Sequence, residues 1–214
     1  PMFAPVRLLS VMPDPLTNAR FTSDITLKAL TEVTSANGAQ YRALVRKEAT
    51  WRSLRHELES FKPHMVHFEG PWIASYEQLT EQDKSRYESL YIPLPDHQTP
   101  VAEFATVLRN SGVQLLMIGR NGLSRIYENA CAIAAFEIAE QGVSVIAPMR
   151  AIDDTSATTF TTDFYRAFLQ GNKLEFALHL ARRNLASKGG DWTVFALLTD
   201  PERLQYLELV RETA

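Results

Sequence analysis

The stretch AAFEIAEQGVSVIAPM, from Ala134 to Met149, joins the end of a helix to a short strand. Its first half spaces apolar and small residues as a helix packed closely on a sheet does. Gly142 ends this helix, and the run from Val143 to Met149 has the length and composition of a strand. Because a helix that leads directly into a strand is the repeating unit of α/β proteins, the stretch predicts helices packed on a mainly parallel sheet.

The same alternation of short β-rich runs and longer helical segments continues along most of the chain. It predicts a single domain over residues 1–214. The strands are expected at residues 6–12, 40–45, 64–70, 113–119, 143–149 and 192–199. The helices are expected at residues 22–34, 50–61, 125–140, 158–169 and 174–186. The stretch TDPERLQYLELV adds a short terminal helix, with Asp200 as its N-cap and Pro201 at its first position.

One segment, at about residues 75–100, departs from this rhythm. It is first polar (EQLTEQDKSRYES) and then rich in proline (YIPLPDHQTP), and no strand is expected in it. One interpretation is a solvated surface insertion. The other is a lid or partner-docking loop, because long loops in compact domains are often functional.

Composition narrows the classes of function. The net charge of −3 and the isoelectric point near 6.0 provide no broad attraction to nucleic acid or to an anionic membrane. The sequence has no apolar run of the roughly 20 residues that a membrane span needs and no signal-peptide pattern at its start, so a cytoplasmic location is expected. Its one cysteine, Cys131, excludes an internal disulfide framework. The histidines lack metal-ligand spacing and no glycine-rich phosphate loop is present, so neither a metal nor another cofactor is expected.

Several segments resemble a known family. They are VRLLSVMPDP, HMVHFEG and LRNSGVQLLMIGR, then the long run from AAFEIAEQGVSVIAPMR to the end of ALHLARRNLA, and finally DWTVFALLTDP. In this order they resemble a CHAT domain, a member of the caspase-like cysteine peptidases of clan CD. The resemblance spans Val6 to Pro201 and is densest from Gln141 to Ala186. It implies a caspase-like α/β fold with a mostly parallel sheet of about six strands and helices on both faces.

The resemblance also implies where a catalytic dyad would lie. Active members have a His-x-x-x-His-Gly motif at a strand end, in which the second histidine is catalytic, and a cysteine after the next core strand. Here His67 matches the first, structural histidine, whereas Pro71 stands at the catalytic histidine and Asn121 at the nucleophile. Proline has no titratable group and an asparagine amide is not a nucleophile, so the sequence predicts a degenerate, catalytically inactive member.

Cys131 and His67 form the alternative catalytic pair, which would make the chain an active cysteine protease. Against it, Cys131 lies only 11 residues before Gly142, in what reads as one continuous helix, where a buried cysteine behaves as a small apolar residue. His67 is expected to hydrogen-bond a loop backbone at the sheet edge rather than to act as a base.

The expected strand ends still bring together a set of residues suited to binding. These are Trp72, Arg120, Asn121, Arg150, Asp153 and Asp154, all at the carboxyl edge where α/β sheets bind ligands. Two structural alternatives stay open: the paired acids cap a helix, or Arg150 pairs with one of them to order the loop.

The expected function is that of an inactive CHAT domain serving as a protein-interaction, scaffolding or regulatory module. The resemblance implies a larger, multidomain protein of bacterial signalling or defence, in which the partner is another protein or an adjacent domain. The second alternative is a small-molecule or nucleotide-binding domain that uses Arg120 and Arg150.

Overall fold

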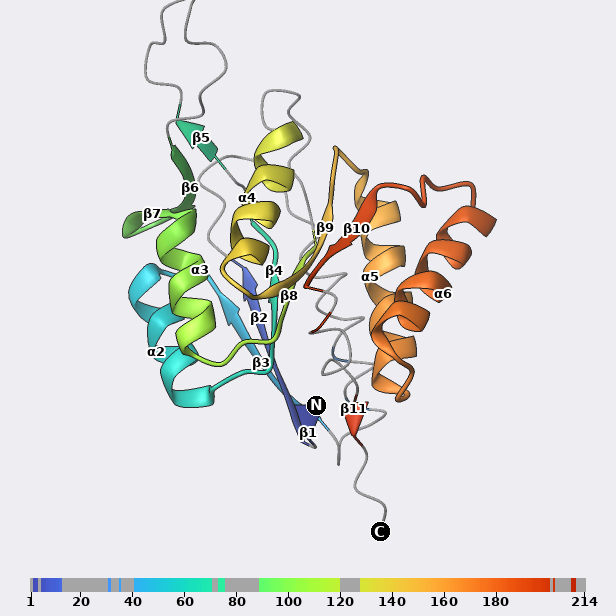
Figure 1. Cartoon of the computed structure of the whole chain (residues 1–214), viewed down its shortest axis with the longest axis horizontal. Helices are drawn as coiled ribbons and strands as arrows, with labels where there is room; N and C mark the ends of the chain where they lie inside the picture. Colours follow the sequence, from blue (N-terminus) through green and yellow to red (C-terminus); the bar gives the residue numbers. More distant parts are fainter. Residues whose placement is uncertain are drawn as a thin grey trace, which may run out of the picture.

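The main feature of the fold is a six-stranded sheet with the strand order β10-β9-β8-β4-β2-β3 (Figure 1). The structure is a computed structural model that describes residues 2–3, 5–12, 31, 35, 41–70, 73–75, 89–119, 128–200, 202 and 209–210. The strands of this sheet are β2 (Val6–Met12), β3 (Tyr41–Lys47), β4 (Met65–Phe68), β8 (Leu115–Ile118), β9 (Ser144–Pro148) and β10 (Phe195–Leu198). The first five run parallel, and β10 runs antiparallel to β9. The predicted α/β class and the six-stranded, mostly parallel sheet are confirmed.

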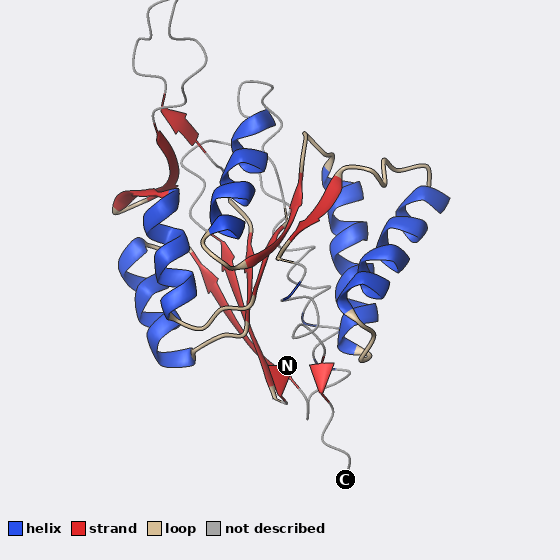
Figure 2. Cartoon of the chain, viewed as in Figure 1, coloured by secondary structure: helices blue, strands red, loops and turns tan. Residues whose placement is uncertain are grey.

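Helices cover both faces of the sheet, as predicted (Figure 2). On one face lie α2 (Trp51–Phe61), α3 (Val101–Asn110) and α4 (Glu128–Glu140), and on the other lie α5 (Asp154–Leu169) and α6 (Leu174–Ser187). Each face has its own buried apolar core, here called the α2–α4 core and the α5–α6 core.

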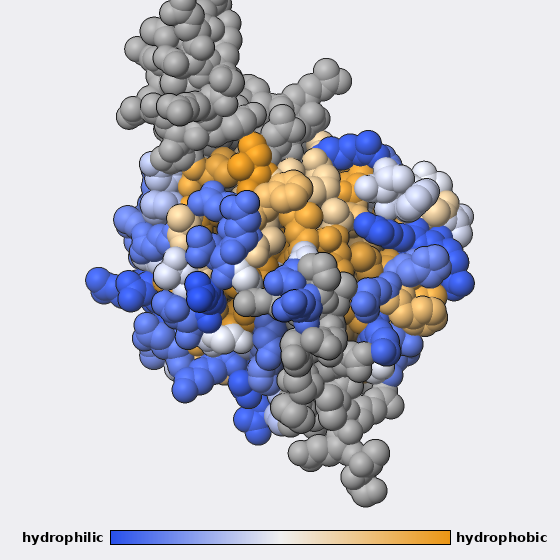
Figure 3. Space-filling model, in the orientation of Figure 1, coloured by the Kyte–Doolittle hydropathy of each residue, from blue (hydrophilic) through white to orange (hydrophobic). Residues whose placement is uncertain are grey.

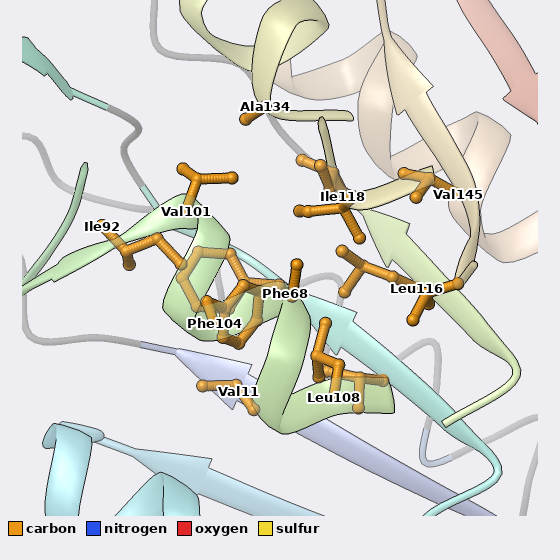
Figure 4. Close-up of a cluster of buried hydrophobic side chains, with 14 of the residues drawn as sticks. Val11, Phe68, Ile92, Val101, Phe104, Leu108, Leu116, Ile118, Ala134 and Val145 are labelled. Carbon is orange, nitrogen blue, oxygen red and sulfur yellow. The ribbon is translucent and has the colours of Figure 1, made fainter. Parts of the chain in front are cut away.

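The strands divide their side chains between these two cores by simple alternation. In β4, Val66 and Phe68 belong to the α2–α4 core, whereas Met65 belongs to the α5–α6 core. Figure 4 shows Phe68 against Phe104, with Leu116 and other side chains of the α2–α4 core nearby. Because successive side chains point to opposite faces, the face on which any strand residue lies follows from its neighbours.

The helix boundaries reflect local capping. Thr50 and Ser53 form a reciprocal capping box at the start of α2. The α5 helix begins at Asp154, earlier than the predicted start at Thr158, because Asp153 caps it. The helix α3 was not predicted, although Val101, Phe104, Ala105 and Leu108 are buried at helical spacing. The helix predicted at residues 22–34 lies outside the described residues, apart from the helical Thr31.

The expectation of no strand within residues 75–100 was wrong. β5 (Ile73–Ser75), β6 (Ser89–Leu94) and β7 (His97–Pro100) form a separate antiparallel sheet. Leu90, Ile92 and Leu94 alternate inward from β6 into the α2–α4 core, a pattern that the neighbouring prolines and polar residues conceal. The hairpin is fixed to the main fold by Asp96, whose carboxylate accepts from the backbone N–H groups of Trp51 at 2.6 Å and Arg52 at 3.2 Å. Residues 76–88 lie outside the described residues.

The C-terminal prediction was correct only at its start. Asp200 accepts from the Glu202 N–H at 2.9 Å, as an N-cap does, and Glu202 is helical. The predicted helix does not extend through the segment's end, because β11 (Leu209–Val210) pairs in parallel with β1 (Met2–Phe3). None of the helices in the described part of the chain is long and apolar enough to cross a membrane.

Candidate functional site

Three buried polar side chains form a hydrogen-bonded network beneath the carboxyl edge of the sheet. The Nε2 atom of His67 lies 3.0 Å from Oε1 of Glu69, and its Nδ1 atom lies 3.3 Å from the hydroxyl oxygen of Tyr165. His67 and Tyr165 are fully buried, and Glu69 is 6% exposed. Both ring nitrogens of His67 are therefore occupied inside the protein.

Strand alternation and one helix bring these residues together. His67 and Glu69 are two residues apart, so both lie on the face of the α5–α6 core, which also holds Met65. Tyr165 reaches them from α5, and its ring meets the His67 ring edge-on at 5.7 Å between centroids. The expectation that His67 hydrogen-bonds a loop backbone was therefore wrong, because its partners are two side chains.

The hydrogen-bond chemistry of this trio is satisfied by a neutral imidazole. Burial, together with the negative charge of Glu69, raises the pKa of Tyr165, so its hydroxyl stays protonated and is available as a donor. The hydroxyl can then donate to Nδ1 of His67, while the Nε2–H group donates to the Glu69 carboxylate. His67 is thus the centre of a buried hydrogen-bond network.

The backbone of Gly119, the residue after β8, lies directly against the side chains of His67 and Glu69. A Cβ atom at this position would lie 2.8 Å from Oε1 of Glu69 and 2.8 Å from both Cε1 and Nε2 of His67. Such distances are too short for any real carbon contact, so the backbone approaches the network closely only because glycine has no side chain. None of Glu69, Tyr165 and Gly119 was predicted from the sequence as a site residue.

The alternative pair of Cys131 and His67 is not brought together. Cys131 lies within α4 and is fully buried in the α2–α4 core. His67 lies on the opposite face of the sheet, among residues of the α5–α6 core. Burial raises the pKa of the Cys131 thiol well above its ordinary value. The sheet itself therefore separates the thiol of this chain from His67.

A polar rim lies at the same edge, where β9 ends and β10 begins. Arg150 bonds to the carboxylate of Asp191, and its guanidinium also donates to the Thr193 hydroxyl at 2.6 Å. Trp192, between these two partners in sequence, is 50% exposed. The alternative that Arg150 pairs with Asp153 or Asp154 was wrong, because the carboxylate bonded to Arg150 is that of Asp191, which was not predicted.

The paired acids after β9 serve the helix that follows. Asp153 accepts from the Ser156 N–H at 2.9 Å, and hydrogen bonds from Ser156 hold the pKa of Asp153 below its usual value. Asp154 lies in the first turn of α5, where its negative charge interacts favourably with the helix dipole. The structural alternative, in which the acids cap a helix, is thus confirmed for Asp153.

Four of the residues singled out from the sequence lie outside the described residues: Pro71, Trp72, Arg120 and Asn121. Among the residues that the structure does describe, no group of three or more His, Cys, Asp or Glu side chains could hold a metal ion.

No protein-family model matches the sequence, and no curated protein matches it. Similarity is found instead among solved structures. The Arg-specific cysteine proteinase gingipain R (RgpB) matches with a TM-score of 0.58 and 8% sequence identity, over 91% of this chain and 46% of the gingipain chain. The chain therefore has a caspase-like fold.

The caspase-like chain spans less than half the length of the gingipain chain that it matches. A second similar structure is the protein GSU0716 from Geobacter sulfurreducens, with a TM-score of 0.53 and 10% identity over 97% of both chains. At these identities the similarity concerns the fold alone.

Proposed function

We propose that this caspase-like domain is a CHAT domain without peptidase activity, which works as a binding, scaffolding or regulatory module of a larger protein. One observation carries the proposal. The chain contains a single cysteine, and the structure buries it in the core on the opposite side of the sheet from His67.

Cysteine peptidases need a thiolate that is open to substrate and close to an imidazole. Cys131 is not open to substrate, because it is fully buried, and burial keeps its thiol protonated. It also lies on the opposite face of the sheet from His67. His67 also has both ring nitrogens engaged by Glu69 and Tyr165. The sequence supports the same conclusion, since Pro71 and Asn121 stand where the resemblance to CHAT domains places the catalytic residues.

The polar rim supports the binding half of the proposal. Exposed tryptophan and arginine side chains are the types that most often anchor protein interfaces, and Trp192 lies beside the partners of Arg150. The partner is another protein or an adjacent domain. The setting in bacterial signalling or defence follows only from the resemblance.

The test is a cleavage assay on a broad mixture of peptides that includes cleavage sites after arginine. We expect the purified chain to cleave no faster than its Cys131→Ser variant, with circular dichroism showing that both are folded. Cleavage that is abolished both in Cys131→Ser and in His67→Ala would contradict the proposal and establish an active protease.

A further inference from the structure

The two edges of the main sheet differ in how they are protected. The strand β3, at one edge, carries Arg42, Arg46 and Lys47, and charged side chains of this kind discourage an edge strand from pairing with another chain. The strand β10, at the other edge, has the sequence Phe-Ala-Leu-Leu and no charge. The residues of β10 itself therefore lack the charged side chains that β3 carries.

The ladder between β9 and β10 shows which backbone groups point outward from the sheet. The Met149 N–H donates to the Val194 carbonyl at 2.8 Å, and the antiparallel register continues from this pair along β10. Because residues of an antiparallel strand direct their N–H and C=O groups alternately to its two sides, Phe195 and Leu197 direct theirs away from β9. Arg182 donates to the Phe195 carbonyl, which agrees with this direction.

Leu197 is left with an outward N–H and an outward C=O. In the sheet order of the described residues, no strand lies beyond β10 to pair with them. A backbone donor and acceptor on one residue, facing outward from a strand without charged residues, form the template to which an extended peptide adds as a further strand.

The surface beside this edge is apolar. Figure 3 shows hydrophobic residues gathered over α4, β9 and β10. Phe136 on α4 is 54% exposed, and α4 contacts β10. Ala196, Leu197 and Leu198 are only half-buried. An incoming strand would therefore place alternate side chains beside these apolar residues, with the Arg182 guanidinium at the Phe195 end of the edge.

We propose that β10 binds an extended, uncharged segment of a partner polypeptide, with apolar side chains at alternate positions, by strand addition centred on Leu197. The inference rests on the proposal that the domain works by binding a partner. The exposed rim of Arg150 and Trp192 indicates neither how a partner binds nor which kind of segment binds, whereas the β10 edge indicates both.

A second copy of the chain fits this edge less well than a single partner strand does. In a two-fold pair centred on Leu197, the Phe195 carbonyl of each copy would have to accept from the other copy, but Arg182 already occupies that carbonyl. A symmetric pair would therefore have to displace or share the Arg182 hydrogen bond in both copies, whereas a single partner strand would have to do so in one.

The test starts with selection of peptides on the folded chain from a displayed library of random dodecapeptides, followed by synthesis of the enriched peptides. Leu197→Pro removes the outward N–H, and proline is tolerated on edge strands where the N–H faces away from the sheet. Leu197→Ala is the matched control, because it shortens the same side chain and keeps the N–H. We expect the selected peptides to bind the wild type and Leu197→Ala with affinities within about threefold, and to lose about tenfold or more on Leu197→Pro.

Hydrogen exchange of the wild-type chain gives a readout that depends on no variant. The Leu197 N–H should exchange at least about tenfold more slowly when the peptide is saturating. The strand-addition proposal is overturned if no peptide is enriched, if binding survives Leu197→Pro, or if exchange at Leu197 does not change. If sedimentation shows that the wild type is a dimer and that Leu197→Pro is a monomer, the edge binds a second copy of the chain, and the proposed partner segment is overturned. None of these results bears on peptidase activity, so they are distinguishable from failure of the cleavage test.

Discussion

Replacement of Gly119 by alanine is expected to destabilise the domain by about 3 kcal/mol, measured as the loss of unfolding free energy in urea. The new Cβ atom would lie 2.8 Å from Oε1 of Glu69 and from two atoms of the His67 ring. The ring cannot withdraw easily, because it is fully buried and Tyr165 lies at 3.3 Å on its other nitrogen. Accommodating the methyl group requires the buried network or the end of β8 to move.

A second glycine provides the control for this substitution. Gly112 has open space where a Cβ atom would lie, but its φ of +79° is one that side chains rarely adopt, so Gly112→Ala should cost about 1 kcal/mol. If crowding of His67 is the cause, the cost of Gly119→Ala should also be smaller in a His67→Ala background. Equal costs for the two glycine variants, with no coupling to His67, would show that Gly119 is not packed against the trio.

Replacement of His67 by alanine is the second change with a large expected effect, a loss of about 3 to 4 kcal/mol. The imidazole is the shared partner of Glu69 and Tyr165, so its removal takes a hydrogen bond from a carboxylate that is only 6% exposed. It also leaves a cavity against α5. Thermal or urea unfolding of the purified variant measures the loss.

Tyr165→Phe is the matched control for His67→Ala. It removes only the hydroxyl that lies 3.3 Å from Nδ1 of His67 and leaves the contact between His67 and Glu69 intact, so it should cost about 1 kcal/mol. A His67→Ala variant as stable as Tyr165→Phe would mean that the buried trio contributes little to the stability of the domain.

Much of the main sheet could be predicted from the sequence, because each of its strands is a short run bounded by turn signals. The run from Val143 to Met149 shows this most clearly. The hairpin of β6 and β7 was missed because Pro93 and the Pro95-Asp96 turn mask the alternation of Leu90, Ile92 and Leu94. Its anchor is tertiary, since Asp96 caps a helix that precedes it by 45 residues in the chain.

The candidate site was predictable only in its local parts. Asp153 could be identified as a cap because a cap depends on neighbouring residues. Alternation alone also places His67 and Glu69 on one face of β4. The contact of His67 with Tyr165, across 98 residues, and that of Arg150 with Asp191, across 41, depend on how α5 and β10 pack on the sheet, which no local pattern states.

The proposed function depends most on the separation of the Cys131 thiol from the His67 imidazole, and titration of the Cys131 thiol tests this separation most directly. The ultraviolet absorbance of the thiolate can be followed from about pH 5 to pH 9 in the folded wild type, with Cys131→Ser as the blank. Because burial raises the pKa of Cys131, we expect no thiolate signal across this range until the chain is unfolded in urea. A thiolate signal that appears below pH 7 in the folded chain and disappears in His67→Ala would contradict the claim.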